Sequence, residues 1–270
     1  MPIPGSLQVD LGIENAERVA GGCIHDCYRV SIGGTTRFLK TNSKEHEDAF
    51  AAEADGLAAL RAAGMRAPEP ISHGVAGARA YLVLEHLDLG GRKDFAALGR
   101  MLAASHRRRA PRFGWRRDNY IGATPQVNGW CDDWEEFWVE RRLRPQVALA
   151  LRNGFKIDLP PISVLKGHEP PPSLLHGDLW GGNAGFTAEG PVVFDPAVYY
   201  GDREADLAMT ELFGGYPREF YEAYGEAWPL DEGYERRKPM YNLYHLLNHL
   251  NLFGAGYLAQ VEAALRLVSQ

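Results

Sequence analysis

Short stretches that contain apolar residues, separated by glycine turns, recur along the first third of the chain. Two of them border a glycine-containing turn within residues 19–30, and another covers residues 35–40 after a pair of glycines, where period-two alternation places Lys40 on the same face as Phe38. Two more stretches, residues 68–74 and 78–84, lie on either side of a further glycine turn, and residues 81–84 are apolar throughout, as in a central strand. Stretches of this kind between glycine turns are typical of antiparallel strands. The first third of the chain is therefore predicted to form a sheet.

One amphipathic helix interrupts these strands, over residues 45–64. Its apolar stripe consists of Phe50, Ala54, Leu57 and Leu60. Glu53 lies on the same stripe, because it is three residues from Phe50 and four from Leu57. A carboxylate on an apolar face needs a cationic partner, since an isolated buried charge is very costly. Lys40, at the end of the preceding strand, is the nearest candidate, and we predict a Lys40–Glu53 pair.

Helical spacing dominates after Glu85. Helices are predicted over residues 94–106, 134–153, 241–253 and 256–268, and Pro145 is expected to kink or break the second of them. Asp132 or Asp133 is the predicted N-cap of that second helix, and Asp202 is the predicted N-cap of a further helix within residues 199–213. Asp206 is predicted to face inward and to brace the loop at residues 176–183, although a solvated helix carboxylate is the alternative. Residues 113–130 are predicted to form a long ordered loop. Strands before Glu85 and helices after it predict an α+β chain of two lobes with a cleft between them.

A loop between two short apolar strands carries the residues with the clearest chemistry. His176, Asp178 and Asn183 have the spacing of a kinase catalytic loop, and Asp195 ends the next strand, where a second metal-binding Asp is expected. In phosphoryl transfer, one carboxylate accepts the proton of the attacking hydroxyl, while an amide oxygen and a second carboxylate hold Mg²⁺ against ATP phosphates. Asp and Asn in glycine-rich loops often only make turns. Four such residues at matching spacing favour phosphoryl transfer.

Two further segments have the positions expected of a nucleotide site. Gly21 and Gly22 could let backbone N–H groups approach phosphate oxygens, although a plain hairpin turn is the alternative. Glu85, His86 and Leu87 leave the last predicted strand where a hinge between lobes would bind the adenine edge through backbone groups. An ordinary strand-to-helix connector is the alternative there. Pro196 follows Asp195 in place of the Phe-Gly of protein kinases, which indicates a small-molecule phosphotransferase.

Composition and charge exclude some other classes of function. A net charge of −6 argues against a general nucleic-acid binder, and no apolar run approaches the ~20 residues of a membrane span. The first residues lack the basic and apolar regions of a secretory signal. The three cysteines favour a reducing, cytoplasmic compartment over a disulfide framework. His245 and His249 share a helix face, and a structural role is preferred to a metal site.

The sequence resembles the fructosamine kinase (ketosamine-3-kinase) family, within the larger protein-kinase-like and aminoglycoside-phosphotransferase-like group. The segments that carry the resemblance are residues 21–24, 84–87, 120–134, 176–183, 194–197, 201–208 and 212–215. They occur in the family's order over most of the chain. The sequence Leu179-Trp180-Gly181 within the loop is more particular to this family than the loop spacing itself.

The resemblance implies a two-lobed protein-kinase-like fold. Residues 1–87 would form the nucleotide-binding lobe, an antiparallel sheet with one main helix, and residues 88–270 a larger, mainly helical lobe for catalysis and substrate binding. The implied reaction is phosphorylation, dependent on ATP and Mg²⁺, of a sugar hydroxyl on a small or protein-bound ketosamine such as fructosyl- or ribulosyl-lysine. Because the phosphorylated product releases the amine, the implied role is deglycation, a form of protein repair.

The resemblance also implies a role for individual residues. Asp178 would be the catalytic base, Asn183 and Asp195 the metal ligands, Lys40 the phosphate-binding lysine and Glu53 its partner. In addition, Trp180 would form a wall of the sugar site, and Cys23 would permit a redox-linked homodimer, with a buried, inert thiol as the alternative. Two other functions are a kinase for another hydroxyl compound, such as an aminoglycoside, and a pseudokinase that only binds. A pseudokinase is disfavoured because five charged and polar residues of the site are intact, namely Lys40, Glu53, Asp178, Asn183 and Asp195.

Overall fold

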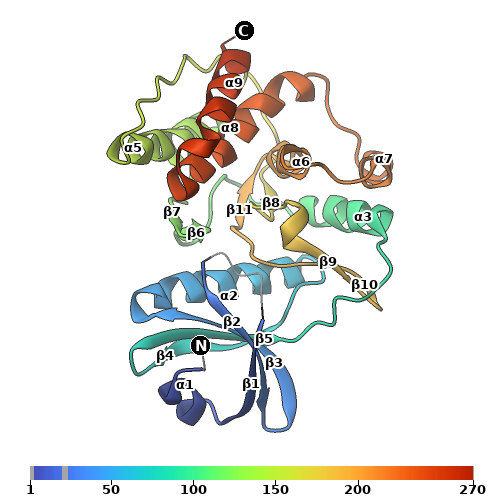
Figure 1. Cartoon of the computed structure of the whole chain (residues 1–270). Helices are drawn as coiled ribbons and strands as arrows, with labels where there is room; N and C mark the ends of the chain where they lie inside the picture. The colour runs from blue at the N-terminus through green and yellow to red at the C-terminus, as the bar shows by residue number, and fades with distance from the viewer. Residues whose placement is uncertain (1–2, 20–23, 270) are drawn as a thin grey trace. The chain divides into compact units, whose positions relative to one another are not determined.

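The computed structural model describes residues 3–19 and 24–269 (Figure 1). Contacts within the chain divide it into two compact units. The first unit consists of Met1–Lys93 and Gly185–Asp195, and the second of Asp94–Ala184 and Pro196–Gln270. A sheet dominates the first unit and helices dominate the second, which confirms the predicted α+β fold. A functional division after residue 87 stays a prediction.

The first unit is built on a five-stranded sheet in the order β1-β2-β3-β5-β4. The strands are β1 (Ile13–Val19), β2 (Asp26–Ile32), β3 (Thr35–Ser43), β4 (Pro70–Ala76) and β5 (Arg79–Glu85). All neighbouring pairs are antiparallel. Gly33 and Gly34 join β2 to β3 with φ of 57° and 70°, values that glycine adopts without strain. The predicted strands and this hairpin turn are confirmed.

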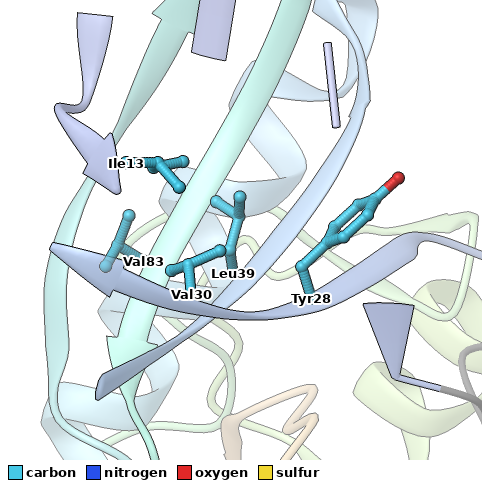
Figure 2. Close-up of a cluster of buried hydrophobic side chains, with 5 residues drawn as sticks. All are labelled: Ile13, Tyr28, Val30, Leu39 and Val83. Carbon is cyan, nitrogen blue, oxygen red and sulfur yellow. The ribbon is translucent and has the colours of Figure 1, made fainter. Parts of the chain in front are cut away.

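One face of this sheet carries a buried apolar cluster of Ile13, Tyr28, Val30, Leu39 and Val83 (Figure 2). Leu39 is the register partner of both Tyr28 and Val83, so these three side chains lie on the same face. Lys40 follows Leu39 and therefore points to the opposite face. The helix α2 (Glu47–Ala62) packs against β4 and β5. Its predicted stripe residues Phe50, Leu57 and Leu60 are fully buried.

A two-stranded hairpin, β9 (Ala184–Thr187) and β10 (Gly190–Val193), belongs mostly to the first unit. The backbone N–H of Val193 donates to the Arg66 carbonyl at 3.0 Å, and that of Gly91 donates to the Phe186 carbonyl at 2.9 Å. A Cβ on Gly91 would lie 1.9 Å from the Thr187 carbonyl oxygen, so only glycine permits this approach. The strand β10 ends at Val193, two residues before Asp195, where the sequence predicted the strand to end, and the attachment of the hairpin places Asp195 in the first unit.

The second unit is mainly helical. Its elements are α3 (Phe95–His106), α4 (Trp134–Trp138), a π-helical turn (Val139–Leu143), α5 (Arg144–Arg152), α6 (Arg203–Leu212), α7 (Arg218–Ala227), α8 (Tyr234–Phe253) and α9 (Leu258–Val268), with the strand pairs β6 (Asn119–Ile121) and β7 (Thr124–Gln126), and β8 (Ser173–Leu175) and β11 (Tyr199–Gly201). Among these helices, α3 packs on α7, and α8 packs on both α6 and α9. No helix within residues 3–19 and 24–269 is both long and apolar enough to cross a membrane.

Several predicted boundaries differ from the structure. The helix predicted over 134–153 is interrupted by the π-helical turn just before Pro145, as expected of a residue that lacks an N–H group and clashes with the preceding turn. Asp133, one of the two predicted caps, accepts a hydrogen bond from the Glu136 N–H. The helix α8 begins at Tyr234 rather than at 241 and contains Pro239. The predicted loop at 113–130 includes the short β6–β7 hairpin.

Candidate active site

The first unit brings together an ammonium group and two carboxylates. Lys40 on β3 donates to Glu53 Oε1 on α2 at 2.7 Å, and its Nζ also contacts Oδ1 of Asp195, which lies two residues after the end of β10. The predicted Lys40–Glu53 pair is thus present. Lys40 is 6% exposed, while the Asp195 side chain is 49% exposed. The cluster therefore holds a buried cation whose second carboxylate partner remains accessible to a ligand.

The charges of this cluster are mutually stabilised. Burial alone would lower the pKa of Lys40, but Asp195 and Glu53 outweigh burial and raise that pKa above its ordinary value, so the ammonium stays charged. Among the residues that the structure describes, Asp195 is the one non-glycine residue with positive φ, at 57°. Asp tolerates this conformation better than most residues, yet at some cost in strain. Strained backbone of this kind is concentrated at functional sites.

The second unit contains the loop predicted to be catalytic. It leaves β8 and passes through His176 and Gly177, whose backbone N–H groups donate to Asp206 at 2.7 and 2.8 Å. Asp206 lies in the first turn of α6 and also contacts His106 Nε2 at 3.1 Å. Burial alone would raise the pKa of Asp206, but the His106 hydrogen bond and the other contacts hold it below its usual range. The predicted inward orientation and bracing role of Asp206 are confirmed.

Gly177 is required by its surroundings. Its φ is 82°, and a Cβ at this position would lie 2.1 Å from the carbonyl oxygen of Ala197. The Ala197 N–H donates to the His176 carbonyl at 2.9 Å. The chain segment that directly follows Asp195 and Pro196 is therefore in close backbone contact with the loop. Any side chain at Gly177 would separate the two segments.

Asp178 and Asn183 are joined within this loop. The Asn183 amide Nδ2 donates to the Asp178 carbonyl at 2.8 Å and to Asp178 Oδ2 at 3.1 Å. Because its nitrogen is used in this way, the Asn183 amide oxygen is the atom able to coordinate a cation. Asp178 Oδ1 lies 4.0 Å from His245 Nδ1 on α8. The carboxylate of Asp178 is thus held at one oxygen by Asn183, while its other oxygen faces a histidine.

Trp180 presents a partly exposed indole ring beside these residues, with 38% of the residue exposed. A Cβ on Gly182 would lie 2.3 Å from this ring, so glycine is needed for the ring to cross over the loop. The Tyr216 hydroxyl donates to the Trp180 carbonyl at 3.0 Å, and the ring of Phe213 lies edge-on at 6.5 Å between ring centroids. The indole is therefore positioned by the loop itself and by the segment after α6.

The sequence did not reveal a buried polar network that supports the segment after Asp195. Asn119 donates to the Val198 carbonyl at 2.8 Å, and Gln126 donates to the Ala197 carbonyl at 3.1 Å. Gln126 and Asn128 both donate to Asn119 Oδ1, at 2.8 and 2.7 Å. These residues come from the predicted loop at 113–130. Gln126 and Asn128 lie in the family-like segment 120–134, but polar residues in an aromatic-rich loop do not themselves indicate burial.

Arg142, in the π-helical turn, also forms hydrogen bonds with this network. It is fully buried and donates to Asn128 Oδ1 and to the Val127 carbonyl, both at 2.6 Å. Its guanidinium lies 4.0 Å from the ring centroid of Tyr199 and 4.6 Å from that of Phe137. Aromatic faces and carbonyl oxygens stabilise this buried cation. The network therefore links the π-helical turn to the backbone that follows the metal-ligand candidate Asp195.

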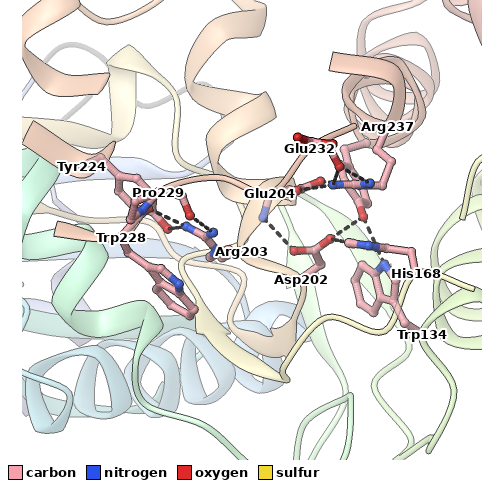
Figure 3. A network of polar contacts seen from close by, with 11 residues as sticks. Trp134, His168, Asp202, Arg203, Glu204, Tyr224, Trp228, Pro229, Glu232 and Arg237 are labelled. Carbon is pink, nitrogen blue, oxygen red and sulfur yellow. Dashed lines mark hydrogen bonds and ion pairs between the residues drawn. The ribbon is translucent and has the colours of Figure 1, made fainter. Parts of the chain in front are cut away.

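A second group of acidic residues lies at the start of α6 (Figure 3). Asp202 accepts the Glu204 N–H at 3.0 Å, which confirms the predicted N-cap, and it also binds His168 Nε2 at 2.7 Å and the Tyr241 hydroxyl at 2.6 Å. Arg237 donates to both Glu204 oxygens, at 2.6 and 2.7 Å. His168, Asp202 and Glu204 have the spacing of metal ligands. Their protein partners already satisfy them, and we interpret them as structural.

The remaining predicted nucleotide-site residues are only partly described. The carboxylate of Glu85 binds Arg66 at 2.6 and 2.8 Å, and its backbone N–H donates to the Glu69 carbonyl at 2.9 Å. His86 and Leu87 follow β5 without regular secondary structure and are half-buried. Gly21, Gly22 and Cys23 lie outside the described residues. The meeting of the Lys40 cluster with the Asp178 loop in one cleft stays a prediction.

Comparison with known proteins identifies the family. The sequence pattern that defines the fructosamine kinase family matches residues 4–270. A protein of Synechocystis sp. named a probable ketoamine kinase is 46% identical over 265 residues, with 94% of this chain and 90% of the relative covered. The chloroplastic protein-ribulosamine 3-kinase of Arabidopsis thaliana is 39% identical over 254 residues, with 88% and 78% covered.

Solved structures agree with this relationship. A Haemophilus somnus protein whose crystal structure carries a provisional fructosamine-3-kinase name superposes with a TM-score of 0.89 at 29% identity, covering 98% of this chain and 96% of that one. An aminoglycoside phosphotransferase, APH(4)-Ia in complex with ADP and hygromycin B, superposes with a TM-score of 0.63 at 14% identity, covering 99% and 97%, and thus shares the fold. The match of the family pattern to almost the whole chain shows that this protein belongs to the fructosamine kinase family.

Proposed function

We propose that this protein transfers the γ-phosphoryl group of ATP to a sugar hydroxyl of a ketosamine. The observation that carries the proposal is the match of the fructosamine kinase pattern to residues 4–270, within which the residues needed for phosphoryl transfer are intact. The names of the ketoamine and ribulosamine kinase relatives support the same substrate class. Release of the amine from the phosphorylated sugar would make the reaction a deglycation step in protein repair.

The acceptor side of the reaction is assigned to the catalytic loop. Asp178 acts as the base that accepts the proton of the attacking hydroxyl. Asn183 fixes the orientation of that carboxylate through its hydrogen bond to Oδ2, and Asp206 fixes the loop backbone. Trp180 forms an apolar wall for the sugar ring. The contacts of these residues within the second unit support the proposed roles.

The nucleotide side is assigned to the first unit. Lys40, held by Glu53, binds ATP phosphates, and the backbone of Gly21 and Gly22 covers them. Leu87 and His86 bind the adenine edge through backbone groups, with the Glu85 carbonyl as a third contact, since the Glu85 N–H already has a partner in Glu69.

We assign the Mg²⁺ ligands to Asn183 and Asp195. Both residues offer oxygen atoms, the donors that Mg²⁺ prefers. The amide nitrogen of Asn183 is engaged by Asp178, so its oxygen is suitably placed for a cation. The side chain of Asp195 is half-exposed, and its Oδ1 contacts Lys40. When bound, the ion would neutralise phosphate charge.

The test is a substrate panel with ATP consumption and phosphate transfer as readouts. Fructosyl-lysine and ribulosyl-lysine, free and in a peptide, are compared with hygromycin B and other aminoglycosides. We expect transfer to the ketosamines and not to the antibiotics. Asp178→Ala should abolish turnover while ATP binding persists, because the base acts on the acceptor. Transfer only to an aminoglycoside, or near-full activity of Asp178→Ala, would contradict the proposal.

We also propose a cytoplasmic location and a redox-linked homodimer through Cys23. The small number of cysteines supports a reducing compartment. Among the described cysteines, Cys27 and Cys131 are buried and free, and burial raises the pKa of Cys27 to about 11, which disfavours its reaction. Peroxide treatment followed by a non-reducing gel should give a dimer that Cys23→Ser does not form. A dimer that persists in Cys23→Ser would reject the assignment.

A further inference from the structure

His245 is a buried histidine with no assigned role. It lies on α8, is 3% exposed, and its Nδ1 has no hydrogen-bond partner among the residues that the structure describes. Buried polar atoms are nearly always paired, because an unpaired one loses its interactions with water and gains nothing in return. Burial lowers the pKa of His245 to about 3, so the imidazole is neutral at physiological pH and carries a single N–H. A ligand bound next to Nδ1 would supply the hydrogen-bond partner that this nitrogen lacks.

The unpaired nitrogen faces the catalytic base. His245 Nδ1 lies 4.0 Å from Asp178 Oδ1, whereas Asp178 Oδ2 accepts a hydrogen bond from Asn183 at 3.1 Å. A separation of 4.0 Å is too long for a direct hydrogen bond. It is, however, suitable for one oxygen atom at about 2.8 Å from each, which is the usual hydrogen-bond length. The gap therefore has the size of a bridging hydroxyl group.

We propose that His245 Nδ1 and Asp178 Oδ1 together bind the acceptor hydroxyl of the substrate. This inference rests on the proposed function and adds a residue to it. The hydroxyl donates its proton to Asp178 and accepts a hydrogen bond from the N–H of the neutral imidazole at one of its two lone pairs. The second lone pair remains available for attack on phosphorus. A neutral histidine suits this task, since it orients the oxygen without competing for the proton.

The transfer step leaves His245 unchanged. The acceptor oxygen forms a bond to the γ-phosphorus, and the bond between that phosphorus and the bridging oxygen of ADP breaks, with its electron pair remaining on ADP. The hydroxyl proton passes to Asp178. His245 neither gains nor loses a proton, and its contribution is to hold the acceptor oxygen in line for attack.

Two substitutions test this role because they differ in where they place a polar atom. His245→Asn puts an amide group near the position of Nδ1, and His245→Gln puts it near Nε2. With fructosyl-lysine as acceptor, His245→Gln should lower kcat/KM about tenfold or more, whereas His245→Asn should retain most of it. The KM for ATP should stay within about twofold in both variants, because the contact concerns the acceptor alone.

A wild-type measurement makes the test independent of variant folding. In ¹⁵N-histidine-labelled protein with AMP-PNP bound, the Nδ1 resonance of His245 should shift when fructosyl-lysine is added. Absence of that shift, equal kcat/KM for His245→Gln and wild type, or equal losses toward ATP and acceptor would overturn the inference. Failure of the wild type to phosphorylate any ketosamine would instead reject the proposed function, and this inference with it.

Discussion

The side chain of Lys40 contacts one residue that is close to it in the sequence and one that is far from it. Its ammonium is buried between Glu53, which is 13 positions away, and Asp195, which is 155 positions away. The first partner could be predicted, because a carboxylate on the apolar stripe of a helix requires a nearby cation. The second could not be predicted as a contact, because no local pattern encodes a separation of that size.

Lys40→Met should destabilise the protein strongly. The substitution leaves the Glu53 carboxylate buried without its cation, and loss of one partner of a buried pair costs about 3–5 kcal/mol. Adding Glu53→Gln should recover part of this loss, since the uncompensated charge is then gone. Urea unfolding curves of the single and double variants measure the difference, and equal stabilities would contradict the prediction.

The matched control is an ion pair in the same sheet that is open to solvent. Arg18 binds Asp26 at 2.9 Å, with side-chain exposures of 54% and 25%. Exposed pairs contribute about 0–1 kcal/mol, because water screens the charges and both side chains lose conformational freedom. Arg18→Met should therefore shift the free energy of unfolding by no more than this amount.

At the scale of elements, the loop at residues 176–183, which we propose to be catalytic, is held in place by its contacts with the surrounding residues. Asp206 binds two of its N–H groups, Asn183 closes it on itself, and the backbone of Ala197 packs directly against Gly177. Asp206 and Ala197 join other parts of the second unit to the loop, whereas the Asn183 contact lies within the loop. The loop is therefore held rigidly even though it contains almost no regular secondary structure.

Gly177→Ala should inactivate the enzyme, and Gly214→Ala is its matched control. Both glycines have positive φ, at 82° and 92°. A Cβ on Gly214 would have no atom of the described residues within 4 Å, whereas one on Gly177 would meet the Ala197 carbonyl. The control should lose only about 1–2 kcal/mol of stability from backbone strain. Displacement of the loop by about 1 Å in Gly177→Ala should lower kcat about a hundredfold. Similar kcat values for the two variants would argue against the contact.

Most of the fold could be predicted because its signals are local. Apolar stretches between glycine turns predicted the sheet, and helical stripes together with the caps Asp132 or Asp133 and Asp202 predicted several helices. The network around Gln126 could not be predicted, because its polar residues are buried only through contacts with backbone carbonyls distant in sequence. The helix α8 begins seven residues before the predicted start at 241 and contains Pro239. Within the candidate site, spacing singled out Asp178 and Asn183 as candidates, but it did not predict the hydrogen bond between them.

At the scale of the whole molecule, the buried, neutral His245 makes the free energy of unfolding depend on pH. His245 has an ordinary pKa of 6.5, which burial lowers to about 3 in the folded protein. Between these values the unfolded chain binds a proton at this position and the folded chain does not, so stability decreases as pH falls. The groups around the imidazole are His249, Asp206 and Arg142, with Asp178 at 4.0 Å, and burial dominates their combined effect.

Acidification should therefore weaken the wild type more than His245→Asn. The difference between the two should grow by about 1.4 kcal/mol for each pH unit below 6.5, the value expected for one proton. Urea unfolding at pH 7.5, 6.5 and 5.5 measures the difference in free energy of unfolding. Parallel curves for the two proteins would show that His245 accepts a proton in the folded state.

The first unit is assembled from two separate stretches of chain, Met1–Lys93 and Gly185–Asp195. A chimaera that exchanged only the leading stretch with that of a relative would take Lys40 and Glu53 from one parent and Asp195 from the other. An excised fragment ending at residue 93 would likewise lack the aspartate that its lysine contacts. Recombination between family members should therefore yield working hybrids most often when the crossover points carry the short hairpin along with the leading stretch.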